Sequence, residues 1–117
     1  MGHTIVEIEI SDMNGKHSEK VKALVDTGAT LTTLPKSLAD KLGIESVKTE
    51  CVRTGAGIVK IEQGHAWIKV YEKEGPFMVW ISDFIDKVLL GVVVLQSLGF
   101  EVDPTTEKLK SVPLLLY

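Results

Sequence analysis

The chain has 117 residues, enough for one domain with a single hydrophobic core. Apolar residues make up 44% and charged residues 25%, as in ordinary globular proteins, and a net charge of −3 argues against a nucleic-acid partner. The single cysteine, Cys51, excludes an intrachain disulfide and favours a reducing compartment, so we expect a cytoplasmic protein. The apolar runs are too short to span a bilayer and no signal-peptide pattern is present, so no membrane partner is expected.

The first third of the chain is predicted to form a β-hairpin, a loop and a short helix. Thr4–Ile10 alternates apolar and acidic side chains, as in a half-buried strand, and an Asn-Gly turn signal follows at position 14. Lys20–Val25 is the expected returning strand. A proline begins the segment Pro35–Leu42 and Gly43 follows it, which together predict a helix over these residues.

The middle of the chain is predicted to consist of strands joined by glycine-containing turns. Glu45–Arg53 and Ile58–Glu62 flank the glycine-rich tip Thr54–Gly57, which indicates a β-hairpin with a mobile turn. Further strands are expected over Trp67–Tyr71 and Phe77–Ser82, with a turn at positions 74–76 between them.

An internal repeat helps to interpret the last third of the chain. The pattern Leu-Gly-apolar-Glu at Leu42–Glu45 recurs at Leu98–Glu101, and a strand, a glycine and a helical stretch precede the first copy. By analogy Val88–Leu90 is a strand and Val92–Leu98 a helix, although its valines favour a strand by propensity alone.

The chain is expected to end with a strand over Phe100–Val102, a turn, and an apolar segment over Ser111–Tyr117. Many short strands with one or two short helices predict a mainly β domain, closed into a barrel, that covers residues 1–117.

The candidate functional residues lie where the apolar strand ends in Asp26-Thr27-Gly28. A carboxylate at the end of a buried strand loses its hydration, which is costly unless nearby groups satisfy it. Thr27 supplies a hydroxyl, and Gly28 lets backbone N–H groups come close to the carboxylate. Small apolar neighbours would partly desolvate Asp26, as is typical of carboxylates used in acid–base chemistry. The alternative is an Asx-type turn in which Asp26 only caps its own loop.

The segment Val25-Asp26-Thr27-Gly28-Ala29 resembles the active-site loop of the retropepsin-like (retroviral-type) aspartic proteases. The order of elements over nearly the whole chain is also similar to that family, and closest to its cellular and prokaryotic-type members. The resemblance implies the closed β-barrel of the retropepsin (acid protease) fold. The hairpin Val52–Ile61 would be the flap that closes over the substrate, and Leu89-Leu90-Gly91 the second hydrophobic-hydrophobic-Gly loop. Viral members place Arg after that glycine, where this chain has Val92.

The resemblance also implies an aspartic-type endopeptidase, in which two carboxyl groups share a proton; one activates water and the other polarises the peptide carbonyl. Because the chain has one Asp-Thr-Gly loop, two copies of Asp26 would have to meet in a homodimer acting on a polypeptide. The apolar tail Val112–Tyr117 or the Thr4–Ile10 strand is the predicted dimer surface. The predicted catalytic residues are Asp26, Thr27 and Gly28, and the predicted substrate-binding residues are Ala29, Thr54, Gly55, Ala56, Gly57, Leu90 and Gly91.

Two other interpretations stay open. A homodimer of the same fold could bind peptides or mediate assembly without cleaving them, and an unrelated small β domain could carry Asp-Thr-Gly by chance. The histidines are scattered without metal-ligand spacing, so no metal site is predicted. Gly55 and Gly57 have no βαβ context, so they predict no dinucleotide site, and no cofactor is expected.

Overall fold

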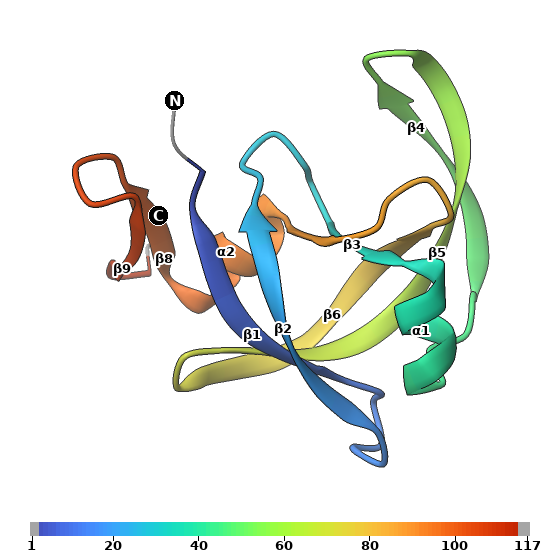
Figure 1. Cartoon of the computed structure of the whole chain (residues 1–117), viewed down its shortest axis with the longest axis horizontal. Coiled ribbons are helices and arrows are strands. Elements are labelled where there is room, and N and C mark those ends of the chain that lie inside the picture. Colours follow the sequence, from blue (N-terminus) through green and yellow to red (C-terminus); the bar gives the residue numbers. More distant parts are fainter. Residues whose placement is uncertain (1–2, 115–117) are drawn as a thin grey trace.

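The structure is a computed structural model that describes residues 3–114 (Figure 1). The described chain alternates short strands with two one-to-two-turn helices. The strands are β1 (Ile5–Ser11), β2 (Ser18–Val25), β3 (Thr32–Pro35), β4 (Lys48–Thr54), β5 (Gly57–Val70), β6 (Lys73–Ser82), β7 (Val88–Leu90), β8 (Phe100–Asp103) and β9 (Lys108–Ser111), and the helices are α1 (Lys36–Leu42) and α2 (Val92–Leu98). The predicted mainly β fold with two short helices is confirmed.

Six of the strands close into a barrel. They pair in the order β1-β2-β7-β3-β6-β5, and β5 returns to pair with β1 in antiparallel register. β4 adds to the free edge of β5, so the β4–β5 hairpin projects from the barrel, on the same side as the loop that follows β2 (Figure 1). β8 and β9 form a separate two-stranded sheet on the opposite side of the barrel from this hairpin.

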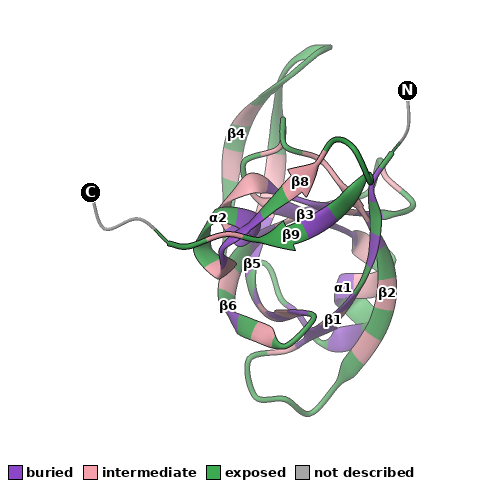
Figure 2. Cartoon of the chain, turned by 90° about the vertical axis from the view of Figure 1, so that its left-hand side faces the viewer, coloured by how far each residue is buried: buried purple, intermediate pink, exposed green. Residues whose placement is uncertain are grey.

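Period-two alternation along the strands fills the barrel. In β1, Val6, Ile8 and Ile10 are at most 5% exposed, whereas Glu7 faces solvent opposite Lys22 of β2. Burial of each such aliphatic side chain contributes about 1.5 to 3 kcal/mol. The buried residues form one cluster, which combines the inward-facing residues of the barrel strands with residues of both helices, β8 and β9. Figure 2 shows these buried positions along the ribbon.

Both predicted helices are confirmed, and the glycines end them as expected. Gly43 and Gly99 follow α1 and α2 with φ of 71° and 75°, the left-handed conformation that favours glycine at a helix C-terminus. Pro35 is the N-cap of α1 and the last residue of β3 rather than the first helical residue. No helix among the described residues is long and apolar enough to cross a membrane.

Two predicted boundaries in the middle of the chain are wrong. Ile58–Glu62 and Trp67–Val70 belong to one continuous strand, β5, which passes through Gly64 and ends one residue before the predicted Tyr71. A Cβ at Gly64 would lie 2.7 Å from the carbonyl oxygen of Glu45, because another segment crosses the strand there. The predicted turn at positions 74–76 lies inside β6; the chain turns earlier, at Tyr71, whose φ is 55°.

Sequence patterns also missed two short strands. β3 has four residues and pairs parallel with β6, and β9 returns against β8. The apolar end of the chain was predicted as one segment, but positions 112–114 are not in a strand, and positions 115–117 lie outside the described residues.

Candidate active site

Asp26 follows the last residue of β2, and backbone hydrogen bonds fix both its main chain and its side chain. β2 pairs in parallel with β7, and the Asp26 N–H continues this pairing by donating to the carbonyl of Leu90 at 3.0 Å. The Gly28 N–H donates to Oδ1 of Asp26 at 3.0 Å, and the Ala29 N–H donates to the Asp26 carbonyl at 3.1 Å. The local geometry is that of an Asx turn. The turn itself holds the Asp26 carboxylate in a fixed position, so the Asx turn and the catalytic interpretation are compatible.

A second loop, which begins at Gly91, locks against the first. The N–H groups of Val92 and Val93, which open α2, donate to the carbonyls of Ala29 and Thr30 at 2.8 and 3.1 Å. The first N–H groups of a helix have no acceptors within the helix. Two carbonyl groups of the Asp26 loop therefore act as acceptors for the first two N–H groups of α2. The position of Asp26 therefore depends on β7 and α2 as well as on its own strand.

The side chain of Thr32 completes this interlock. Its Oγ1 accepts a hydrogen bond of 3.0 Å from the Gly91 N–H, and Thr32 is fully buried. Sequence reasoning did not single out this residue, because its role depends on a contact between loops 59 positions apart.

We expect Thr32→Val to destabilise the protein by about 1 to 3 kcal/mol, because the isosteric valine leaves the buried Gly91 N–H without its acceptor. Urea unfolding measures the change. Thr33→Val is the matched control: the Thr33 hydroxyl makes only a long hydrogen bond of 3.5 Å to the carbonyl of Leu31. Equal stability losses in the two variants would contradict the role given to Thr32.

A cavity of about 950 Å³ lies between the Asp26 loop and the β4–β5 hairpin. On the hairpin side its lining mixes apolar residues, including Val52, Val59 and Ile61, with the charged residues Arg53, Lys60 and Glu62. Phe84, in the loop between β6 and β7, also lines it and is 91% exposed.

Charged side chains cluster at one part of this cavity. Lys36 lies 2.9 Å from Asp40 and 4.0 Å from Glu62, and Asp83 lines the same cavity. The hydrogen bond to Asp40, followed by the attraction of that carboxylate, raises the pKa of Lys36 above its ordinary value.

The structure brings together most of the predicted site residues. Those that line the cavity are Asp26, Gly28, Ala29, Thr54, Gly55 and Ala56. Gly57 belongs to the hairpin tip but is not part of the lining. Leu90 and Gly91 do not line the cavity either: Leu90 is fully buried in the barrel, and it contributes its carbonyl to the Asp26 loop. The leucine that faces the cavity is Leu89.

Sequence reasoning also missed Trp80 as a cavity residue. Val79 and Ile81 are buried in the barrel, so the alternation of β6 turns Trp80 to the other face, where it lines the cavity. The same alternation in β7 turns Leu89 outward between the buried Val88 and Leu90. The face cannot be assigned from the sequence, because both neighbours and the residue itself are apolar.

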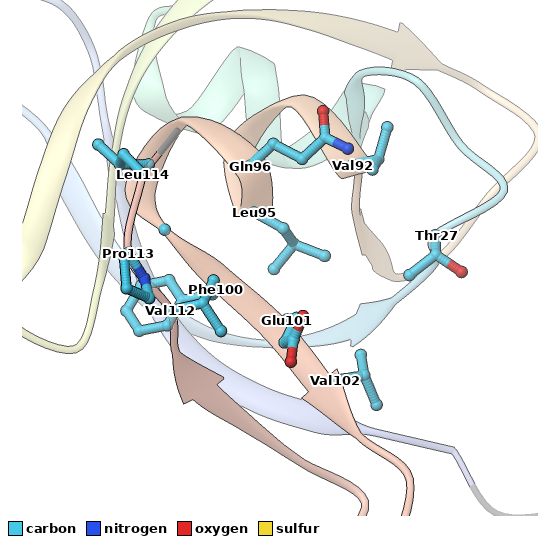
Figure 3. Close-up of a pocket in the computed structure, with 11 residues that line it drawn as sticks. Thr27, Val92, Leu95, Gln96, Phe100, Glu101, Val102, Val112, Pro113 and Leu114 are labelled. Carbon is cyan, nitrogen blue, oxygen red and sulfur yellow. The ribbon is translucent and has the colours of Figure 1, made fainter. Parts of the chain in front are cut away.

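Thr27 does not line this cavity; it lies at the edge of a second hollow, of about 450 Å³ (Figure 3). Apolar side chains of α2, β8 and the segment after β9 line it, among them Leu95, Val102 and Leu114, together with the polar Gln96 and Glu101. Leu114 is 66% exposed. The Asp26 loop thus separates two hollows, one under the hairpin and one against the C-terminal part of the chain.

Comparison with known families agrees with this geometry. Residues 11–97 match the family described as "gag-polyprotein putative aspartyl protease". The chain belongs to this family. No curated protein matches the chain significantly.

Solved structures show the same retropepsin-like fold. The EIAV protease in complex with an inhibitor superposes with a TM-score of 0.65 at 19% identity, over 98% of this chain and 94% of that one. A retropepsin-like aspartic protease from Rickettsia conorii gives a TM-score of 0.57 at 26% identity, over 87% and 85% of the two chains. The simian foamy virus protease gives 0.55 at 26% identity, over 78% and 90%.

The retropepsin-like site offers general acid–base chemistry at one carboxyl group per chain. Gly28 holds Oδ1 of Asp26, and no residue between positions 3 and 114 donates a hydrogen bond to Oδ2. The described residues contain no cluster of side chains suited to a metal ion. Glu62 and Asp83 line the same cavity, but neither lies in a glycine loop that would fix its carboxylate against Asp26.

Proposed function

We propose that the protein is an aspartic-type endopeptidase whose catalytic dyad consists of the Asp26 side chains of two copies in a homodimer. The observation that carries the proposal is the placed carboxylate: the Gly28 N–H holds Oδ1 of Asp26 at the wall of a cavity that the β4–β5 hairpin covers. Each chain has one such loop, and family membership agrees with this chemistry.

In the proposed mechanism, the two carboxyl groups share one proton, because two neighbouring carboxylates do not both ionise readily. The ionised Asp26 takes a proton from a water molecule, whose oxygen attacks the scissile carbonyl carbon. The protonated Asp26 of the other copy donates its proton to the carbonyl oxygen. As the gem-diol collapses, one of its hydroxyls returns a proton to the ionised Asp26, the C–N bond breaks, and the leaving nitrogen takes the proton of the other Asp26, which restores the monoprotonated dyad.

The β4–β5 hairpin is the proposed flap, and an extended polypeptide is the proposed substrate. The tip residues Thr54, Gly55 and Ala56 line the cavity, and β4 has a free backbone edge. A peptide strand can pair with backbone groups of this kind while its side chains enter pockets on either side. Closure of the flap would exclude bulk water from the dyad. The single cysteine supports the proposed cytoplasmic location.

Of the two predicted dimer surfaces, the structure favours the C-terminal one. β1 pairs on both edges from Ile8 to Ser11 and buries Val6, Ile8 and Ile10 in the barrel, so only its first residues, among them the 62% exposed Ile5, are available to a second copy. The hollow beside Thr27 is mostly apolar, although Gln96 and Glu101 also line it; it adjoins the Asp26 loop and includes the exposed Leu114. A two-fold axis near Thr27 would bring the two Asp26 loops together.

Hydrolysis and mass measured on the same sample test this proposal. We expect the protein to cleave a denatured protein or a random peptide library at some pH between acidic and neutral, and light scattering to show a dimer. Specific activity should fall on dilution as the dimer dissociates. A dimer that cleaves nothing across this range would favour a peptide-binding or assembly module instead. An inactive monomer would contradict both.

A further inference from the structure

The flap hairpin has few attachments to the barrel. β4 is the last strand of its sheet and pairs through its backbone with β5 alone. Every residue from Arg53 to Lys60 is exposed (Figure 2). Near the base of the hairpin, Lys36 of α1 lies 4.0 Å from Glu62 of β5. The position of the flap over the cavity therefore depends on side chains of the barrel that contact β4.

Trp80 of β6 is such a side chain. Its indole Nε1–H donates a hydrogen bond of 3.1 Å to Oε1 of Glu50 on β4. In the sheet, Trp80 pairs with Gln63 of β5, and Glu50 pairs with Ile61 of β5. Residues two apart on a strand share a face, so the indole crosses β5 diagonally between Gln63 and Ile61.

The acceptor of this hydrogen bond is a carboxylate with a cation beside it. Nζ of Lys48 lies 3.9 Å from Oε2 of Glu50, and both side chains project from the same face of β4. A hydrogen bond to an ionised acceptor is stronger than one between neutral groups. Glu50 is half-buried, which reduces competition from water for the indole N–H.

The same indole also lines the cavity. Trp80 is in register with Thr33 of β3, and Thr33 with Leu89 of β7, so these three residues lie on the same face of the sheet and line the cavity together with Asp26.

We propose that the Glu50–Trp80 hydrogen bond is a latch that sets the closed position of the flap, with Trp80 as a positioning residue. The effect of the latch on the flap follows from the structure alone. Its effect on kinetics rests on the proposed function.

Hydrogen exchange of the β4 amides tests the latch without any substrate. In Glu50→Ala and in Trp80→Phe, exchange over residues 48–59 should become several-fold faster. Glu50→Gln keeps an acceptor oxygen and should stay near the wild-type rate. The matched control is Glu74→Ala, which removes a similar bond of 2.7 Å to Trp67 at the far end of the β5–β6 hairpin and should leave residues 48–59 unchanged.

Kinetics then test the consequence for catalysis. A flap that is closed for a smaller fraction of the time binds peptide more weakly in proportion to that fraction. We expect Glu50→Ala to raise KM several-fold with a much smaller change in kcat, and Glu50→Gln to restore most of the loss. The double variant Glu50→Ala with Trp80→Phe should have a KM only slightly higher than that of Trp80→Phe alone, because both substitutions remove the same hydrogen bond.

Unchanged exchange in Glu50→Ala, or equal acceleration in Glu74→Ala, would overturn the latch. The latch would also be overturned if the increases in KM of Glu50→Ala and Trp80→Phe, expressed as free energies, added in full in the double variant. Because exchange is measured on the free protein, it decides the latch even for a chain that cleaves nothing. Failure of the protease proposal and failure of the latch are therefore distinguishable.

Discussion

Asp26→Asn should lower the rate of peptide hydrolysis by at least about a thousandfold and leave the fold and the dimer intact. Asparagine keeps an oxygen for the Gly28 N–H, whose bond to Oδ1 is 3.0 Å, so the loop retains its conformation. It cannot take a proton from water or donate one to the peptide carbonyl as a carboxyl group does. Measurement of kcat, light scattering and thermal unfolding on the same preparation separates these effects.

The same variant tests whether two copies share one site. If wild-type and Asp26→Asn chains are mixed in equal amounts and allowed to exchange partners, about one quarter of the dimers carry two aspartates. Activity at fixed total protein should then fall to about one quarter of that of the pure wild type. If each chain instead carried an independent site, the mixture would keep about one half of the activity of the pure wild type.

Asp83→Asn is the control for a general loss of charge in the cavity. Asp83 lines the same cavity as Asp26, but it is exposed and belongs to the loop between β6 and β7. We expect this variant to retain most of the wild-type kcat. A large loss here, or appreciable hydrolysis by Asp26→Asn, would contradict the assignment of the dyad to Asp26.

Local signals in the sequence were sufficient for much of the fold. The Asn-Gly pair marks the β1–β2 turn, and Gly43 and Gly99 mark the ends of both helices, because a left-handed conformation favours a particular residue type at a particular place. The Asp26 loop was predictable for the same reason. Its side chain bonds to a backbone group two residues away, so the sequence of the loop contains most of the interaction.

Features that depend on distant parts of the chain were not predictable in this way. Gly64 lies between two strands that were predicted separately, and only the close approach of the Glu45 carbonyl shows why a glycine stands inside the continuous strand β5. The choice between Leu89 and Leu90 for the cavity face depends on how β7 pairs with β2 and β3. The role of Trp80 depends on a bond that crosses a whole strand to Glu50. In each case the deciding partner lies far away in the sequence.

Gly91→Ala should reduce the free energy of unfolding by about 3 kcal/mol, the upper part of the range for overpacking a well-packed interior. A Cβ at this position would lie 2.5 and 2.6 Å from the carbonyl carbon and oxygen of Leu31, and 2.8 Å from the nitrogen of Thr32. These are backbone atoms of the segment that leads into β3, so no side-chain rotation can relieve the clash. Urea unfolding at an unchanged slope measures the loss.

Gly55→Ala is the matched control for this effect, because a Cβ at Gly55 would meet no atom within 4 Å. It should leave the stability within about 0.5 kcal/mol of the wild type. Equal unfolding midpoints for Gly91→Ala and the wild type would show that the two loops are not packed as described.

The Gly91 substitution should also reduce catalysis in whatever fraction of the protein stays folded. To make room for a Cβ, the chain at Leu31 and Thr32 must move away from Gly91, which lengthens the bond from the Gly91 N–H to Oγ1 of Thr32. Ala29, three residues before Thr32, accepts the Val92 N–H at 2.8 Å, so that bond is strained by the same movement. The carboxylate of Asp26 is therefore placed by a glycine 65 positions away, and stability and activity should fall together in this variant.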